Sequence, residues 1–158
     1  MNRNRRQTLS LALLISLFCV QQLGAQTKTL DADPVKIKRL QPYLQTPNLI
    51  GQGKLTYWGF DVYLASLWAS ENSVNAEQWQ MQRIALELNY LRDFKGADIA
   101  KSSMDQIQAQ SPLASSKATL WLKTLEGIFP NINKGQTLVG IYIPNVGAQF
   151  LQENALIG

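Results

Sequence analysis

The sequence predicts an α+β domain in which an antiparallel sheet carries helices packed on one face. Three observations support this prediction. Residues 49–69 form two strand-like segments rich in aromatic side chains, joined near Gly59. Residues 95–129 hold two helical patterns, and residues 137–152 hold two further strand segments joined at a Pro-Asn-Val-Gly turn. With a strand expected at residues 84–92, the order is β-β-β-α-α-β-β, which suits hairpins around a helical pair.

The first 25 residues have the organisation of a secretory signal peptide. Three arginines precede an apolar segment at residues 9–20, and Leu23-Gly24-Ala25 ends in a small residue, so we expect cleavage near Ala25. The apolar segment is shorter than the ~20 residues of a spanning helix, so we expect no membrane span in the mature protein. These features predict a periplasmic or secreted protein.

Loss of the expected signal peptide would change the charge and the thiol content. Without residues 1–25, which hold three arginines and no acidic residue, 12 basic residues face 11 acidic ones, a net charge of +1. Such a chain has no electrostatic footprint for nucleic acid. The single cysteine, Cys19, leaves with the segment, and the chain has no histidine. We therefore expect no zinc, haem or iron–sulfur site, no Ser-His-Asp or Cys-His triad, and no cofactor.

Residues 26–48 are predicted to be an extended lead-in, because Pro34, Pro42 and Pro47 interrupt a polar stretch. Within it, the Val-Lys-Ile-Lys segment at residues 35–38 alternates as a short edge strand would.

The first hairpin is expected to have one core face. Alternation places Asp61 and Tyr63 on one face of its second strand, and Phe60, Val62 and Leu64 on the other, which we expect to face the core.

The next strand alternates as well, with Leu86 and Leu88 on one face and Glu87 and Asn89 on the other. Helices are expected at residues 95–110 and 115–129. The second has the clearer apolar stripe, with Ser115 or Ser116 as its N-cap and Pro130 after its end. We expect Trp58, Trp68 and Trp121 in the core.

Taken in order, several segments resemble the chalcone isomerase-like family, in its exported bacterial branch. Residues 51–63 (Gly-Gln-Gly-Lys-Leu-Thr-Tyr-Trp-Gly-Phe-Asp-Val-Tyr) resemble its opening hairpin, and residues 85–100 its central strand and following helix. Trp121 with Phe-Pro-Asn-Ile-Asn-Lys-Gly at 129–135 resembles the second helix and turn, and residues 140–142 with Phe150 the closing hairpin. The resemblance spans residues 49–158, which we take as one domain. It implies an open-faced β-sandwich with a ligand cleft between a large antiparallel sheet and a layer of helices.

Two departures from the family matter. Plant members isomerise chalcones, whereas other branches bind fatty acids without catalysis. In a gap-free register, the place of the enzymes' catalytic threonine holds Trp58, and their essential arginine falls near Thr46, with no arginine between Arg39 and Arg83. The resemblance thus argues against chalcone isomerisation, and we assign no catalytic residue. Exported members also continue past a Leu-x-Gly into a further helix, so this member is short or the sequence is a fragment.

Polar side chains near the implied cleft are the candidate ligand contacts. A guanidinium suits a ligand carboxylate, and tyrosines pack their rings while offering a hydroxyl. Each candidate also has an interpretation without function. Glu87 and Asn89 would lie on a solvent-facing side of the strand, Arg92 would form a local ion pair with Asp93, and the tyrosines would pack in the core. The candidates are Asp61, Tyr63, Glu87, Asn89, Tyr90, Arg92 and Tyr142.

Three functions follow as hypotheses. The first is an exported, non-catalytic protein that binds a small amphipathic molecule, such as a fatty acid, in an apolar cleft. The second is an isomerase- or lyase-type enzyme of the same fold with another substrate, using Asp61, Glu87 and a tyrosine in acid–base roles. The third is a partner-binding module of the cell envelope. The sequence does not indicate the oligomeric state.

Overall fold

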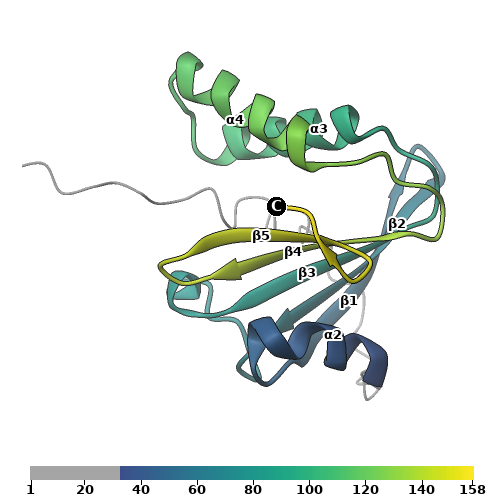
Figure 1. Ribbon diagram of the computed structural model, residues 1–158, viewed down its shortest axis with the longest axis vertical. Coiled ribbons are helices and arrows are strands. Elements are labelled where there is room, and N and C mark those ends of the chain that lie inside the picture. Colours follow the sequence, from purple (N-terminus) through teal and green to yellow (C-terminus); the bar gives the residue numbers. More distant parts are fainter. Residues whose placement is uncertain (1–32) are drawn as a thin grey trace, which may run out of the picture.

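A computed structural model describes residues 33–158 as one six-stranded antiparallel sheet with three α-helices (Figure 1). The strands lie in the sheet in sequence order. They are β1 (Asn48–Tyr57), β2 (Phe60–Ala69), β3 (Ile84–Tyr90), β4 (Thr137–Ile143), β5 (Gly147–Gln152) and β6 (Ala155–Leu156). The helices are α2 (Pro34–Leu44), α3 (Gly96–Gln110) and α4 (Ser115–Ile128), with a 3-10 turn, η2, at Trp79–Met81. The predicted order of strands and helices from residue 48 onward is confirmed, whereas the expected signal peptide lies outside the described residues.

Helix α2 corrects the prediction of an extended lead-in and of an edge strand at residues 35–38. Asp33 caps the helix, because its side chain accepts a hydrogen bond from the Val35 backbone N–H at 2.9 Å. Pro34 occupies the first helical position, where proline starts a helix instead of breaking it. Pro42 lies in the last turn, close to where the helix ends. The helix buries Leu40 and Leu44 against the sheet.

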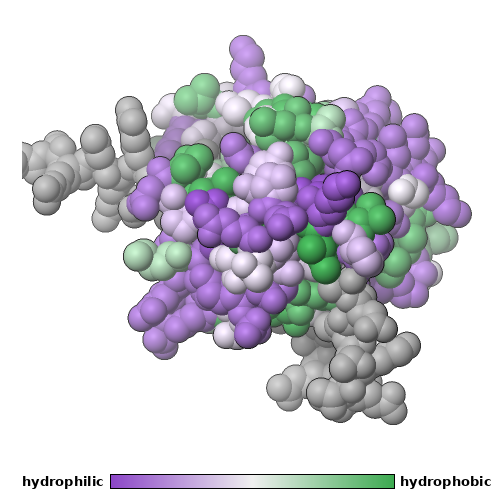
Figure 2. All heavy atoms as spheres, turned by 60° about the horizontal axis from the view of Figure 1, so that its bottom comes forward, coloured by the Kyte–Doolittle hydropathy of each residue, from purple (hydrophilic) through white to green (hydrophobic). Residues whose placement is uncertain are grey.

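Helices cover both faces of the sheet, where the sequence predicted helices on one face. Helices α3 and α4 lie on one side, as predicted, and α2 lies on the other (Figure 1). On the α2 side, the surface is mostly hydrophilic and its hydrophobic residues form small patches (Figure 2). Two buried clusters result: one under α3 that includes Leu86 and Tyr90, and one under α2 that includes Trp68 and Val139.

The core face of β2 is the opposite of the predicted one. Tyr63 and Ala65 are buried in the cluster under α3, whereas Phe60 is 60% and Leu64 46% exposed. Only Val62, of the three residues predicted to face the core, packs against that cluster. Phe60 lies next to the hairpin turn, and Leu64 belongs to neither buried cluster. The aromatic side chains at the hairpin end therefore stand outside the core.

The β1–β2 turn presents an exposed tryptophan. Trp58 and Gly59 both have positive φ, of 52° and 77°, which suits the tight turn of a twisted hairpin. Glycine adopts this conformation freely, but a bulky residue there is an outlier. Trp58 is 83% exposed, so the prediction that it lies in the core is wrong, while Trp68 is buried as expected.

Helix α3 is anchored at its N-terminus by close contacts with the segment at residues 129–132. The Gly96 N–H donates to Asn131 Oδ1 at 3.0 Å, and Phe94 bridges to Ile132. A Cβ atom on Gly96 would lie 2.0 Å from the Phe129 carbonyl oxygen, so only glycine fits. Helix α4 packs against α3, and Leu125 is its one buried residue. The predicted serine N-cap is wrong, because the residue at the N-cap is Ala114. None of the helices in residues 33–158 is long and apolar enough to cross a membrane.

Candidate ligand-binding site

A cavity of about 860 Å³ lies between α3 and the sheet face that carries the first cluster. Its floor comes from strands β1 to β5, which place aliphatic and aromatic side chains on this face by alternation. Pockets that hold small ligands usually measure 300–1,000 Å³ and are mostly apolar. The apolar lining includes Leu55, Val62, Leu86, Leu88, Phe94, Ile99, Phe129, Leu138 and Phe150.

Aromatic pairs form much of the cavity wall. The rings of Tyr63 and Tyr90 meet edge to face with centroids 5.9 Å apart, and Tyr90 packs on Phe94 at 5.3 Å. Phe129 and Phe150 form another edge-to-face pair at 4.9 Å. Such pairs favour fixed relative orientations. The cavity therefore has preformed walls at both its strand and its helix side.

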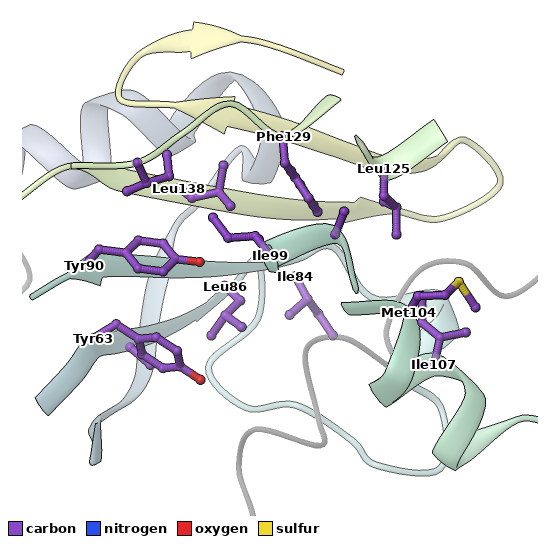
Figure 3. Close-up of a cluster of buried hydrophobic side chains, with 13 residues drawn as sticks. Tyr63, Ile84, Leu86, Tyr90, Ile99, Met104, Ile107, Leu125, Phe129 and Leu138 are labelled. Atoms are coloured by element: carbon purple, nitrogen blue, oxygen red, sulfur yellow. The ribbon is translucent and has the colours of Figure 1, made fainter. Parts of the chain in front are cut away.

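Tyr63 brings a hydroxyl without a protein partner into this apolar space. Its side chain is buried, and its oxygen has no hydrogen-bond partner within the described part of the chain. In Figure 3 the Tyr63 and Tyr90 hydroxyls point in the same direction from adjacent strands. Because buried polar groups are almost always paired, this unpaired hydroxyl is exceptional, and a ligand oxygen would reach it only after a small movement of the side chains around it.

Both tyrosines are protonated at neutral pH, as their ordinary pKa of 10.0 requires, and burial extends this state into alkaline solution. It raises the pKa of Tyr63 far above its usual value, with a further rise from neighbouring Tyr90. Burial also raises the pKa of Tyr90 to about 12. Each hydroxyl therefore remains an O–H donor near neutral pH, suited to an acceptor such as a carboxylate oxygen.

Arg92 supplies a cation to the same cavity. Its guanidinium lies 5.1 Å from the centroid of the Phe60 ring, and its side chain lines the cavity. No ion pair among residues 33–158 involves Arg92. The expected pair with Asp93 is absent, because Asp93 accepts a hydrogen bond from the Lys134 backbone N–H at 2.7 Å instead. Arg92 is thus placed to meet an anionic group.

Helix α3 adds a polar edge that the sequence analysis did not identify. Asp98, Ser102 and Gln106 are spaced by four residues, so they form one ridge along the helix, and all three line the cavity. The four-residue spacing of these polar residues beside the apolar stripe could have identified them in the sequence. Exposed helix positions are usually polar without any function, so the spacing alone does not indicate a site.

Glu87 and Asn89 do not line the cavity, and Glu87 faces α2. Glu87 is 2% exposed, so it is neither the solvent-facing residue nor the cleft residue that the sequence suggested. Its carboxylate pairs with Lys36 and Arg39, each at 2.6 Å. Asn89 donates to the Gly135 carbonyl at 3.1 Å. The sequence correctly separated Glu87 from the face of Leu86 and Leu88, but it did not predict the helix that covers Glu87.

Asp61 and Tyr142 also lie outside the cavity lining. Asp61 is exposed on the hairpin and accepts from Lys54 at 2.8 Å and Thr56 at 2.9 Å; the hydrogen bond from Lys54 is the main cause of its lowered pKa. Tyr142 donates to the Gln80 carbonyl at 3.1 Å. Of the seven candidates, Tyr63, Tyr90 and Arg92 line the cavity.

No protein-family model matches the chain, and no curated protein is significantly similar to it. Among solved structures, the chain is similar to the crystal structure of the Arabidopsis thaliana fatty-acid binding protein AtFAP1, with a TM-score of 0.53 and 11% sequence identity. The match covers 72% of each chain. The fold is chalcone isomerase-like. This likeness confirms the predicted α+β fold with its open antiparallel sheet, while membership of an exported bacterial branch stays a prediction.

Proposed function

We propose that this protein binds a small amphipathic molecule, with a fatty acid as the leading candidate, in the cavity under α3. The observation that carries the proposal is a mostly apolar cavity of about 860 Å³ that contains an unpartnered buried hydroxyl and an arginine. The similarity of fold to a protein named for fatty-acid binding supports the choice of ligand class.

The two polar groups and the apolar lining suit the two ends of such a ligand. Arg92 offers a guanidinium fork and Tyr63 an O–H donor to a carboxylate, and charge-assisted hydrogen bonds offset part of its desolvation. The acyl chain would lie along Leu86, Leu88 and Phe150, where each buried methylene contributes about 0.8 kcal/mol. The ligand would thus span from the Arg92 end into the space under α3.

We further propose that binding takes place without catalysis. The acids considered for acid–base chemistry, Asp61 and Glu87, lie on the exposed hairpin and on the opposite sheet face. A general acid or base must come within hydrogen-bond reach of the reacting group, and neither of these two acids lines the cavity; the acid among residues 33–158 that does is Asp98, on the edge of α3. Export after cleavage near Ala25 is part of the same proposal and is supported by the charge and apolar pattern of residues 1–25.

Native mass spectrometry of the purified full chain tests the proposal, with a fluorescent fatty acid in a displacement titration. We expect a bound mass that extraction identifies as a fatty acid, and displacement by unlabelled fatty acid. Tyr63→Phe should weaken binding several-fold, whereas Tyr142→Phe, which removes a hydroxyl outside the cavity, should leave it unchanged. Absence of binding, or equal effects of the two variants, would sink the proposal.

A further inference from the structure

The tip of the β1–β2 hairpin carries an exposed aromatic cluster, which we call the hairpin tip: Tyr57, Trp58 and Phe60. These side chains are 67%, 83% and 60% exposed. The Tyr57 and Trp58 rings contact each other at 6.3 Å between centroids. Two of the three residues carry a polar atom on an otherwise apolar ring, the side-chain type that concentrates at lipid–water interfaces.

The turn holds its tryptophan in an unfavourable backbone conformation. Tight turns with positive φ at both central positions favour Asn-Gly or Asp-Gly, and here the pair is Trp58-Gly59. A polar residue in place of Trp58 would suit both the turn and water better. The hairpin therefore presents a large aromatic side chain against local preference, which points to a contact outside the chain.

The hairpin tip is also the rim of the cavity. Tyr57, Trp58 and Phe60 all line it, together with Arg92, whose guanidinium stacks over the Phe60 ring. The exposed apolar surface is thus continuous with the apolar interior. A ligand that entered from an apolar phase in contact with this rim would avoid crossing water.

The size of the hairpin tip favours a lipid surface over a protein partner. The three side chains expose on the order of 450 Å² in total, taking roughly 150–250 Å² for each aromatic residue. A stable protein interface buries about 800 Å² on each partner, so this tip alone is too small for one. A bilayer surface needs only a few inserted aromatic side chains, and Arg92 beside them complements lipid phosphate.

We infer that the hairpin tip docks on an anionic lipid bilayer surface, so that the cavity rim opens toward the lipid. The purpose of the docking would be to exchange an amphipathic ligand with the membrane, and this part of the inference rests on the proposed function. The docking itself depends on Tyr57, Trp58 and Phe60, with Arg92 meeting the phosphates.

Vesicle co-sedimentation tests this inference with the full chain in every arm, so that apolar residues 9–20 contribute equally to all variants. The probe is a vesicle of phosphatidylcholine with a minority of phosphatidylglycerol. We expect Trp58→Ser with Phe60→Ser to reduce partitioning about tenfold or more, because two inserted aromatic side chains are lost. Met81→Ser is the matched control, since Met81 is an exposed apolar residue at the end of the Trp79–Met81 turn and does not belong to the hairpin tip.

Quenching of tryptophan fluorescence by brominated lipid locates the contact. We expect quenching in the wild type and its loss in Trp58→Phe, which keeps an aromatic ring and should still bind vesicles. Circular dichroism checks that the serine variants fold. Three results would each overturn the inference. They are an equal loss of vesicle partitioning in Met81→Ser, wild-type partitioning of the double serine variant, and unchanged fluorescence quenching in Trp58→Phe. The inference would also be overturned if the wild type self-associated through the hairpin tip and the double serine variant did not.

The two proposals fail separately. If the protein binds fatty acid but does not partition onto vesicles, the docking is overturned and the proposed function is intact. Vesicle docking by a protein that never carries an amphipathic ligand would overturn the proposed function and leave the docking supported.

Discussion

Arg39 donates a hydrogen bond from Nη2 to Oε2 of Glu87 across 2.6 Å, which joins helix α2 to the central strand β3. Lys36, one turn earlier on the helix, reaches the other carboxylate oxygen, also at 2.6 Å. Strand β3 turns Leu86 and Leu88 toward the cavity on its opposite face. The ion pair therefore fixes α2 behind the floor of the candidate site.

Removing the arginine should destabilise the protein more than removing the lysine. The Arg39 side chain is 11% exposed and that of Lys36 30%, so solvent screens the lysine pair more strongly. Breaking a buried ion pair by deleting one partner typically costs about 3–5 kcal/mol. We expect Arg39→Met to lower the free energy of unfolding by about 3 kcal/mol and Lys36→Met by about 1 kcal/mol or less, measured by urea denaturation.

Two comparisons check the cause of that loss. Adding Glu87→Leu to Arg39→Met should restore part of the stability, because the carboxylate is no longer left buried with a single cation. Lys101→Met, which breaks an exposed pair with Asp105, should have a small effect. Equal losses for Arg39 and Lys36 would contradict the buried-pair account.

The sequence predicted those parts of the fold that depend on local pattern. Alternation identified β3 and placed Glu87 opposite Leu86, and apolar spacing identified both helices of the central pair. It did not predict α2, because the prolines suggested an extended chain and the helix is held by Glu87, 48 residues from Arg39. The face of Tyr63 was wrong for a related reason: with helices on both sides of the sheet, a run of aromatic residues does not indicate which face is buried.

Gly96→Ala should disrupt the start of α3, and Gly127→Ala should not disrupt α4. A Cβ on Gly96 would meet the Phe129 carbonyl oxygen at 2.0 Å, so backbone would have to move. A Cβ on Gly127 meets nothing within 4 Å, and alanine is the better helix former by about 1 kcal/mol. We expect a lower melting temperature for the first variant and a higher one for the second. Similar shifts for both would contradict the packing at Gly96.

Tyr90 should make the stability fall as the solution becomes strongly alkaline. Its folded pKa of about 12 lies above the ordinary value of 10.0, so between these values the unfolded chain loses the phenol proton first. The contribution of Tyr90 to stability is therefore complete below pH 10 and is lost as pH rises toward 12, and Tyr63, whose pKa is also raised, adds to the fall. Tyr90→Phe should make the fall in unfolding free energy above pH 10 less steep, and the remaining slope belongs to Tyr63. An unchanged slope in the variant would mean that Tyr90 is not the group responsible.

Arg92 should distinguish an acid from an alcohol of the same chain length. If its guanidinium meets the ligand carboxylate, Arg92→Gln removes a charge-assisted hydrogen bond, and fatty-acid affinity should fall about tenfold. Affinity for the matching fatty alcohol, which carries no charge, should change little. Lys95→Gln is the control, because Lys95 is a nearby exposed cation that does not line the cavity. Displacement titrations with both ligands measure the difference, and equal losses for acid and alcohol would show that Arg92 shapes the cavity and does not recognise charge.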